Sequence, residues 1–149
     1  DPDAYFSYVY PEGEEAGLPA DPGLADFLDS FVQPKYIFTN APGEHAYRVL
    51  GKLGINGRFR AVYDIRFNGL RGKPHAEAVD RVLAAVRADC GATSEQIVFI
   101  DDVPRYVQGF IDRGGRGVLI DEDGRHGDTG LPTIRRIREL PAMLAAING

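Results

Sequence analysis

Residues 97–102 read Ile97-Val98-Phe99-Ile100-Asp101-Asp102, an apolar run that ends in two adjacent carboxylates. The four apolar residues predict a short buried strand, because continuous apolar runs of this length are typical of strands covered on both faces. Two carboxylates at the end of a buried strand are costly unless a positive charge lies against them. They therefore suggest a divalent cation, first of all Mg²⁺, whose ligands are hard oxygens.

The same two aspartates also have a purely structural interpretation. Asp102 lies two residues before Pro104, and Asp and Pro are typical of the start of a helix, so Asp102 would cap a helix that begins there. The dipeptide alone does not separate a metal site from a helix cap. The residues upstream of it favour one interpretation over the other.

Length and composition predict one globular domain that does not bind nucleic acid. The chain has 149 residues, of which 44% are hydrophobic and 26% charged, enough for a sizeable core. Its net charge of -5 argues against a nucleic-acid backbone as the partner. A small phosphorylated ligand is compatible with this charge, because one local cation can hold it.

The cellular location is predicted from cysteine usage and from the lack of targeting segments. Cys90 is the single cysteine, which excludes an intrachain disulfide and fits a reducing compartment. No apolar run approaches the ~20 residues that a membrane span needs, and no signal peptide is visible. We therefore expect a cytoplasmic protein without membrane contact. The sequence begins with Asp1 rather than Met, which is consistent with the removal of an upstream segment.

Apolar patterns of strands and helices alternate from Asp21 onward. This alternation, with short continuous apolar strands, predicts an α/β fold whose parallel sheet is covered by helices on both faces. Pro141 would kink or split the last helix. The strands are expected at residues 35–40, 61–64, 97–100 and 117–120, and the helices at residues 21–31, 44–53, 74–89, 105–113 and 133–147.

The first twenty residues differ from this pattern. They contain three prolines, an acidic cluster and an isolated aromatic patch, which consists of Tyr5, Phe6, Tyr8 and Tyr10. We interpret residues 1–20 as an N-terminal arm and residues 21–149 as the α/β core. The aromatic patch is expected to pack on another surface rather than remain in solvent.

Three strand ends or nearby loops carry residues that suit phosphoryl chemistry. Ligands of such sheets bind at the carboxyl ends of the strands, so these residues are expected to converge. Asp101 and Asp102 would hold Mg²⁺, and Lys73 would neutralise charge in the transition state. Thr39 and Asn40 would donate hydrogen bonds to phosphoryl oxygens. Each residue alone has an ordinary structural explanation, and Tyr106, which follows the acidic pair, is expected to pack.

The ordered motifs resemble those of the haloacid dehalogenase superfamily of phosphohydrolases. The stretch Phe38-Thr39-Asn40-Ala41 resembles its second motif, Gly72-Lys73-Pro74-His75 its third, and Phe99-Ile100-Asp101-Asp102 its fourth, the acidic metal motif. The residues of all three motifs resemble in particular those of the pyrimidine 5'-nucleotidase-like branch. The resemblance implies a three-layer Rossmann-like fold and a Mg²⁺-dependent phosphatase. Its substrate would be a small phosphorylated metabolite such as a nucleoside monophosphate.

The chain departs from this family at its first motif. Members carry Asp-x-Asp after an N-terminal strand, and the first Asp is the nucleophile that becomes an aspartyl-phosphate; no apolar strand with this ending precedes Thr39 here. The resemblance then implies that residues 1–20 are a remnant of the helical cap and that the central first strand is missing. We expect that the chain alone has no turnover and holds Mg²⁺ weakly or not at all. An upstream segment or a second copy of the chain would complete the sheet.

Other functions fit the residues less well, with one exception. A phosphoacceptor receiver domain also combines an acidic pair, a Thr and a Lys, but its acidic pair comes first in the sequence, whereas Asp101-Asp102 comes last here. Haloacid dehalogenation would also need the nucleophilic Asp, and the acidic pair favours phosphate. The exception is a non-catalytic pseudo-phosphatase that retains the phosphate and metal contacts, which stays open as the alternative.

Overall fold

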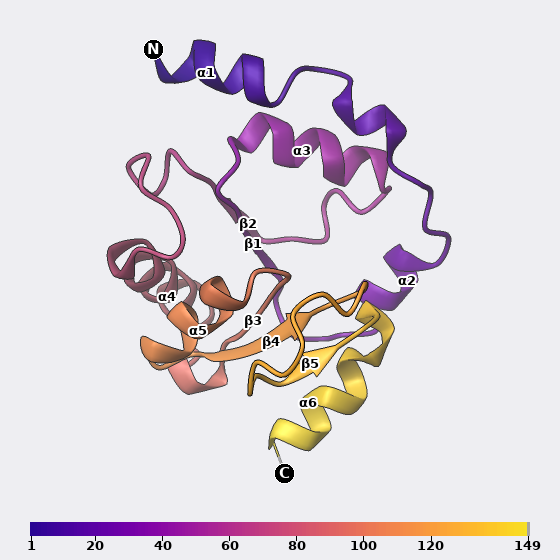
Figure 1. The fold of residues 1–149 in the computed structure, drawn as a ribbon, viewed down its shortest axis with the longest axis vertical. Coiled ribbons are helices and arrows are strands. Elements are labelled where there is room, and N and C mark those ends of the chain that lie inside the picture. Colours follow the sequence, from indigo (N-terminus) through magenta and orange to yellow (C-terminus); the bar gives the residue numbers. More distant parts are fainter. Residues whose placement is uncertain (149) are drawn as a thin grey trace. The chain divides into compact units, whose positions relative to one another are not determined.

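Five short strands form two separate parallel sheets in the computed structural model, which describes residues 1–148 (Figure 1). The chain divides into two compact units, residues 1–72 and residues 73–149, and each unit contains one sheet. Helices lie on both sides of the sheets, so the predicted α/β class with parallel strands is confirmed. The boundary between the units follows Gly72, and the assignment of residues 1–20 to a cap stays a prediction.

The first unit is built on a two-stranded sheet. β1 (Tyr36–Phe38) pairs with β2 (Ala61–Tyr63) in a parallel register that places Phe38 beside Tyr63. Against β2 packs α3 (Gly43–Lys52), whose Ala46 and Leu50 are buried because they lie one helical turn apart on one face. The remaining elements of this unit are α1 (Pro2–Val9), the 3₁₀ helix η1 (Glu14–Gly17) and α2 (Leu24–Asp29).

The N-terminal residues form a short helix with one buried side chain. Asp1 caps α1, because its carboxylate accepts a hydrogen bond from the backbone N–H of Asp3 at 3.0 Å. Phe6 is buried, whereas Tyr5 and Tyr8 are exposed by 60% and 86%. The expected packing of the aromatic patch therefore holds for Phe6 within this chain and not for these two tyrosines.

The second unit is built on a three-stranded parallel sheet with β4 (Arg116–Ile120) in the centre. β3 (Val98–Asp101) and β5 (Thr133–Ile134) pair with its two edges. The strands β3 and β4 are covered by α5 (Pro104–Asp112), which begins with a proline as the sequence predicts. The other elements are α4 (Ala76–Cys90), the 3₁₀ helices η2 (Ser94–Gln96) and η3 (Ile137–Glu139), and α6 (Leu140–Asn148).

The helix expected at residues 133–147 is wrong in its first half. Thr133 and Ile134 instead form β5, where they lie beside Leu119 and Ile120 of β4. Ile134 is 3% exposed, so burial in the sheet outweighs the helical spacing of the apolar residues around it. The helix α6 begins at Leu140, and Pro141 lies in its first turn, the one part of a helix that tolerates a missing N–H.

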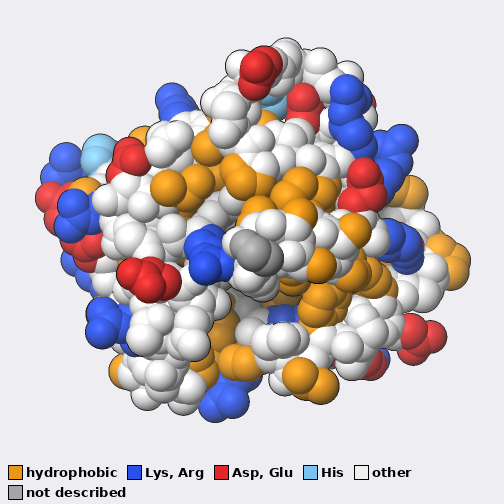
Figure 2. All heavy atoms as spheres, turned by 90° about the horizontal axis from the view of Figure 1, so that it is seen from below, with side chains coloured by type: hydrophobic (Ala, Val, Ile, Leu, Met, Phe, Trp, Pro, Cys, Tyr) orange, Lys and Arg blue, Asp and Glu red, His pale blue; other side chains and the backbone are white. Residues whose placement is uncertain are grey.

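Surface charge agrees with the composition. On the face drawn in Figure 2, basic and acidic side chains are mixed rather than gathered into a single basic area.

Within residues 1–148, none of the helices has the length and apolar character needed to cross a membrane.

Gly117 of β4 allows α5 to lie close to the sheet, which leads to a first prediction. A Cβ at this position would lie 2.6 Å from Cγ1 of Val107 and 3.1 Å from two side-chain carbons of Ile111. Both neighbours belong to α5, so the overpacked variant Gly117→Ala should lose about 1–3 kcal/mol of unfolding free energy. Urea unfolding followed by far-UV circular dichroism measures this loss.

Gly51→Ala provides the matched control for this substitution. Gly51 lies in α3, and a Cβ there meets no atom within 4 Å, so alanine should leave stability unchanged or raise it by up to about 1 kcal/mol. Equal unfolding midpoints for Gly117→Ala and the unchanged chain would contradict the close approach of α5 to β4.

Candidate functional site

The acidic pair lies at the carboxyl end of β3, where an ammonium group meets it. Nζ of Lys73 lies 2.6 Å from Oδ2 of Asp101, and the two side chains are only 7% and 11% exposed. The other carboxylate oxygen of Asp101, Oδ1, accepts the backbone N–H of Val103 at 2.9 Å, just before α5 begins. Hydrogen bonds to both oxygens therefore fix the direction of this carboxylate.

Asp102 lies beside this pair and carries less compensation. Partial burial raises the pKa of its carboxyl, and a hydrogen bond with Asp101 and the charge of Asp101 raise it further. The charge of Lys73 acts in the opposite direction but does not outweigh these effects. The site is thus one carboxylate richer than its ammonium group can balance, and a cation beside Asp102 would be stabilised there.

A pocket of about 470 Å³ opens at the carboxyl ends of β3 and β4, the edge where ligands of parallel sheets bind. Asp101 therefore borders both Lys73 and this pocket. The lining residues come from two segments, the end of β3 and the loop after β4, and are Ile100, Asp101, Asp102, Ile120, Asp121, Glu122, Asp123, Arg125 and His126.

Asp121 holds the loop that forms the second wall of this pocket. Its carboxylate accepts the backbone N–H of Arg125 at 2.9 Å and that of His126 at 3.2 Å. Burial alone would raise the pKa of Asp121, but these two backbone donors and the nearby positive charges outweigh it, so its pKa lies below the usual range. The sequence pattern did not single out Asp121, although it follows an apolar strand just as Asp101 does.

Thr39 and Asn40 lie in the first unit, at the carboxyl end of β1. The backbone N–H of Thr39 continues the ladder to the Tyr63 carbonyl at 3.0 Å. Its Oγ1 accepts the backbone N–H of Ala41 at 3.0 Å, so the hydroxyl oxygen is oriented while its hydrogen remains a donor. The amide of Asn40 lies against Gly72, where a Cβ would overlap its Oδ1.

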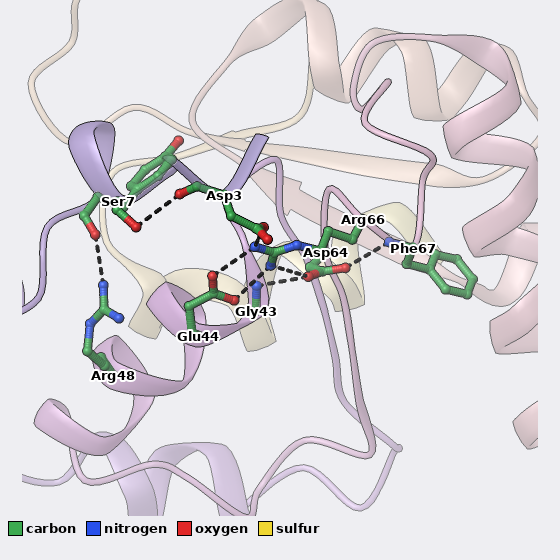
Figure 3. A network of polar contacts seen from close by, with 9 residues as sticks. Asp3, Ser7, Gly43, Glu44, Arg48, Asp64, Arg66 and Phe67 are labelled. Atoms are coloured by element: carbon green, nitrogen blue, oxygen red, sulfur yellow. Dashed lines mark hydrogen bonds and ion pairs between the residues drawn. The ribbon is translucent and has the colours of Figure 1, made fainter. Parts of the chain in front are cut away.

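Asp64 is a residue of this loop region that the sequence analysis missed. Its Oδ2 accepts the backbone N–H of Gly43 at 2.8 Å, and its Oδ1 accepts that of Phe67 at 2.8 Å (Figure 3). The first contact ties the end of β2 to the start of α3, directly after the Thr39-Asn40 turn. The available signal was the pattern seen at Asp101, an aspartate at the end of a short apolar strand, which Asp64 repeats after β2.

Arg66 joins three segments of the first unit near Asp64 (Figure 3). Its guanidinium contacts the carboxylates of Asp3 and Glu44 at 2.8 Å each, and it lies 5.0 Å from the centre of the Phe6 ring. Its hydrogen bond lowers the pKa of Glu44. Arg66 and these two carboxylates are already paired with one another, so the cluster attaches α1 to α3.

The acidic pair offers the type of ligand atom that Mg²⁺ prefers. Its carboxylates are hard oxygen ligands, and Mg²⁺ in proteins is often held by one or two carboxylates together with water and phosphate oxygens. The charge imbalance at Asp102 favours a cation at the same place. Within residues 1–148, no group of three or more His, Cys, Asp or Glu side chains lies close enough to hold a metal by itself.

The structure thus brings together three of the five predicted site residues. Lys73, Asp101 and Asp102 meet at the end of β3 in the second unit. Thr39 and Asn40 lie at the end of β1 in the first unit, and their convergence with the other three stays a prediction.

The buried ion pair of the second unit gives a second prediction. Lys73→Met leaves the Asp101 charge buried without its ammonium partner, so the variant should lose about 3–5 kcal/mol of unfolding free energy. The double variant Lys73→Met/Asp101→Leu should recover most of that loss, because both charges are then gone. Urea unfolding of the two variants measures both values.

An exposed pair serves as the control for this experiment. Arg113 and Asp80 lie 2.7 Å apart, but their side chains are 44% and 47% exposed, so Arg113→Met should cost only about 0–1 kcal/mol. Similar losses for Lys73→Met and Arg113→Met would contradict a special role of burial at the Lys73–Asp101 pair.

Asp121 gives a third prediction, which concerns pH. A carboxylate whose folded-state pKa is lowered stabilises the loop above its usual pKa of about 3.9, and that contribution is lost as the pH falls through the lower, folded-state value. The amide proton shifts of Arg125 and His126 should therefore titrate with a midpoint below about 3.9. Nuclear magnetic resonance spectra recorded against pH measure the midpoint.

Two variants separate this effect from general acid unfolding. Asp121→Asn should abolish the titration of both amides, whereas Asp128→Asn, which removes the charge of an exposed carboxylate that accepts the N–H of Gly130, should leave it unchanged. A midpoint at or above the usual Asp value would overturn the proposed anchoring of this loop.

Comparison with known proteins places this architecture in one family. Residues 3–112 match the haloacid dehalogenase-like hydrolases, and no curated protein matches the chain significantly. Solved structures of similar fold include YfnB from Bacillus subtilis, bound to magnesium, with 21% identity and a TM-score of 0.71 over 83% of this chain and 54% of that one.

Two further solved structures represent different activities on the same fold. The L-2-haloacid dehalogenase of Xanthobacter autotrophicus has 15% identity and a TM-score of 0.68 over 85% of this chain and 61% of that one. A HAD phosphatase from Thermococcus onnurineus has 21% identity and a TM-score of 0.65 over 85% of this chain and 57% of that one. The chain thus spans little more than half the length of these structures. With the family match over residues 3–112, the chain belongs to the haloacid dehalogenase-like hydrolases.

Proposed function

We propose that the chain provides the phosphate- and metal-binding part of a Mg²⁺-dependent phosphomonoester hydrolase. The observation that carries the proposal is the contact of 2.6 Å between Lys73 and Asp101, next to Asp102, at the carboxyl end of a parallel strand. An ammonium group and two carboxylates at this edge suit a phosphoryl group that is bound together with a metal ion. The family match supports a hydrolase of this kind.

Each residue has a distinct role in this proposal. Asp101 and Asp102 would hold Mg²⁺, which supplies charge compensation for phosphoryl oxygens when it is bound. Lys73 keeps Asp101 in place and offers positive charge to the phosphoryl group. Thr39 donates its hydroxyl hydrogen, since its oxygen already accepts the N–H of Ala41. Asn40 donates from its amide.

Dehalogenases share the fold, so the choice of phosphate needs its own argument. The charge imbalance at Asp102 supports a cation, and a cation together with Lys73 suits a dianionic phosphate. The residues of the three motifs support a nucleotidase-like branch, with a nucleoside monophosphate or a similar small phosphate ester as the substrate. The phosphatase among the solved relatives makes this chemistry plausible on the fold.

The nucleophile of the proposed reaction is an aspartate outside the residues described above. No apolar strand that ends in Asp-x-Asp precedes Thr39, where the family carries it; Asp121-Glu122-Asp123 follows β4, after the three other motifs. Among residues 1–148, β1 and β3 each lie at the edge of their sheet. A further strand from an upstream segment or from a second copy of the chain would find unpaired backbone groups on either of them.

Calorimetry on the 149-residue chain tests the proposal. Mg²⁺ alone is expected to bind weakly or not at all, but titration with Mg²⁺ and inorganic phosphate together should release or absorb heat, and Asp101→Asn and Lys73→Met should each abolish the signal. Glu95→Gln, which alters an exposed carboxylate on η2, should leave it unchanged. No heat from the unchanged chain with either ligand would exclude phosphate and metal binding.

Turnover separates binding from catalysis in the same preparation. The 149-residue chain should not hydrolyse an aryl phosphate in the presence of Mg²⁺, because it supplies no nucleophile. Rapid hydrolysis that disappears in Asp101→Asn would refute this part of the proposal and place the nucleophile within the chain. A pseudo-phosphatase would also bind without turnover. Addition of an upstream segment separates the two hypotheses: turnover should appear if the proposal is right and should stay absent if the chain belongs to a pseudo-phosphatase.

A further inference from the structure

Two aromatic rings border the ammonium group of Lys73. Nζ lies 5.1 Å from the centre of the Phe99 ring and 5.1 Å from the centre of the Tyr106 ring. Both distances are within the ~6 Å over which a ring face attracts a cation. The side chain of Lys73 is only 7% exposed, and such attraction is stronger where water is excluded.

The local sequence explains why these rings meet the lysine. Phe99 and Asp101 are two residues apart in β3, so both side chains project from the same face of the strand, and both contact Lys73. Tyr106 lies in the first turn of α5. This helix starts directly after Val103, whose N–H donates a hydrogen bond to Asp101. One strand face and one helix start therefore surround the ammonium group.

We propose that Tyr106 and Phe99 are positioning residues that hold the Lys73 ammonium group at Asp101 and thereby aim it at a bound phosphate. A ring attracts the ammonium group without adding a negative charge, whereas a second carboxylate beside Asp101 would offset the positive charge that Lys73 offers to a phosphate. The inference rests on the proposed function for the role of the phosphate, but the position of the ammonium group can be tested without it.

Tyr106 is the better of the two residues to change. Phe99 also stacks on Phe110, with ring centres 4.9 Å apart, so its removal would damage the core as well. Tyr106 has one further cation beside it, the guanidinium of Arg105 at 5.2 Å from the ring centre. Arg105→Ala therefore serves as a control that alters the surroundings of Tyr106 without removing the ring.

The chain is well suited to a direct measurement, because Lys35, Lys52 and Lys73 are its only lysines. Lysine labelled with ¹³C gives one Cε signal for each, and Lys73→Arg identifies the signal of Lys73. Ring currents should shift the Lys73 signal upfield of the other two. The shift should persist in Tyr106→Phe and Arg105→Ala and diminish in Tyr106→Leu, with Lys35 and Lys52 unchanged.

Binding of inorganic phosphate in the presence of Mg²⁺ tests the consequence for the site. Tyr106→Leu should weaken the affinity by roughly tenfold, and Tyr106→Phe should restore it, because the ring face rather than the hydroxyl acts on Lys73. Should Tyr106→Leu fail to fold by far-UV circular dichroism, Tyr106→Met keeps an apolar side chain of similar size without a ring.

The two readouts distinguish failure of this inference from failure of the proposed function. A Lys73 signal that is the same in folded Tyr106→Leu and in the unchanged chain would overturn the positioning role. If the unchanged chain shows the upfield shift and Tyr106→Leu loses it, but the unchanged chain binds no phosphate, the position of the ammonium group is upheld and the phosphate site is rejected. Loss of affinity in Tyr106→Leu and Tyr106→Phe alike would assign the effect to the hydroxyl and contradict the role of the ring.

Discussion

The parallel ladder between β3 and β4 is the constraint on which the second unit depends. Its register places Asp101 beside Leu119, so that β3 reaches the carboxyl edge of the sheet as its sequence turns from apolar to acidic. β4 runs only a little further before it gives way to Asp121. Both walls of the pocket are thus set by where two neighbouring strands end. Because Gly117 has no side chain, α5 can approach this ladder and present Tyr106 beside Lys73.

Burial decides how much each ion pair of this unit contributes. Lys73–Asp101 and Arg113–Asp80 have nearly equal lengths, 2.6 and 2.7 Å, but the first is almost enclosed and the second is open to water. Enclosure raises both the attraction between the charges and the cost of separating them. The open pair is screened and adds little. Breaking the enclosed pair is therefore costly, although the intact pair adds little net stability over apolar side chains of similar size.

The sequence predicted the elements that have strong apolar patterns and missed those that depend on distant partners. The strand at Ile97–Ile100 and the helix at residues 74–89 were recognisable, because one has a continuous apolar run and the other an apolar face. β5 was assigned to a helix, since two residues are too few to establish a strand period. Lys73 and Asp101 were predicted to meet, whereas the partners of Arg66, one of them 63 residues away, follow no local pattern. The contact of Tyr106 with Lys73 likewise follows no local pattern, whereas Asp64 directly follows a strand and could have been singled out from the sequence.

The attachment of α1 differs in its physical basis from the packing of the sheets. Arg66 links this helix to α3 through Asp3 and Glu44, whose side chains are 76% and 53% exposed. Exposed charges are screened over about 8 Å at physiological ionic strength, and over shorter distances as salt is added. Apolar contacts such as those of Leu50 gain rather than lose under the same change when the salt is a sulfate or phosphate. Added sulfate or phosphate therefore weakens the exposed ion pairs of α1 and strengthens the apolar interior of its unit, to which Phe6 of α1 also belongs.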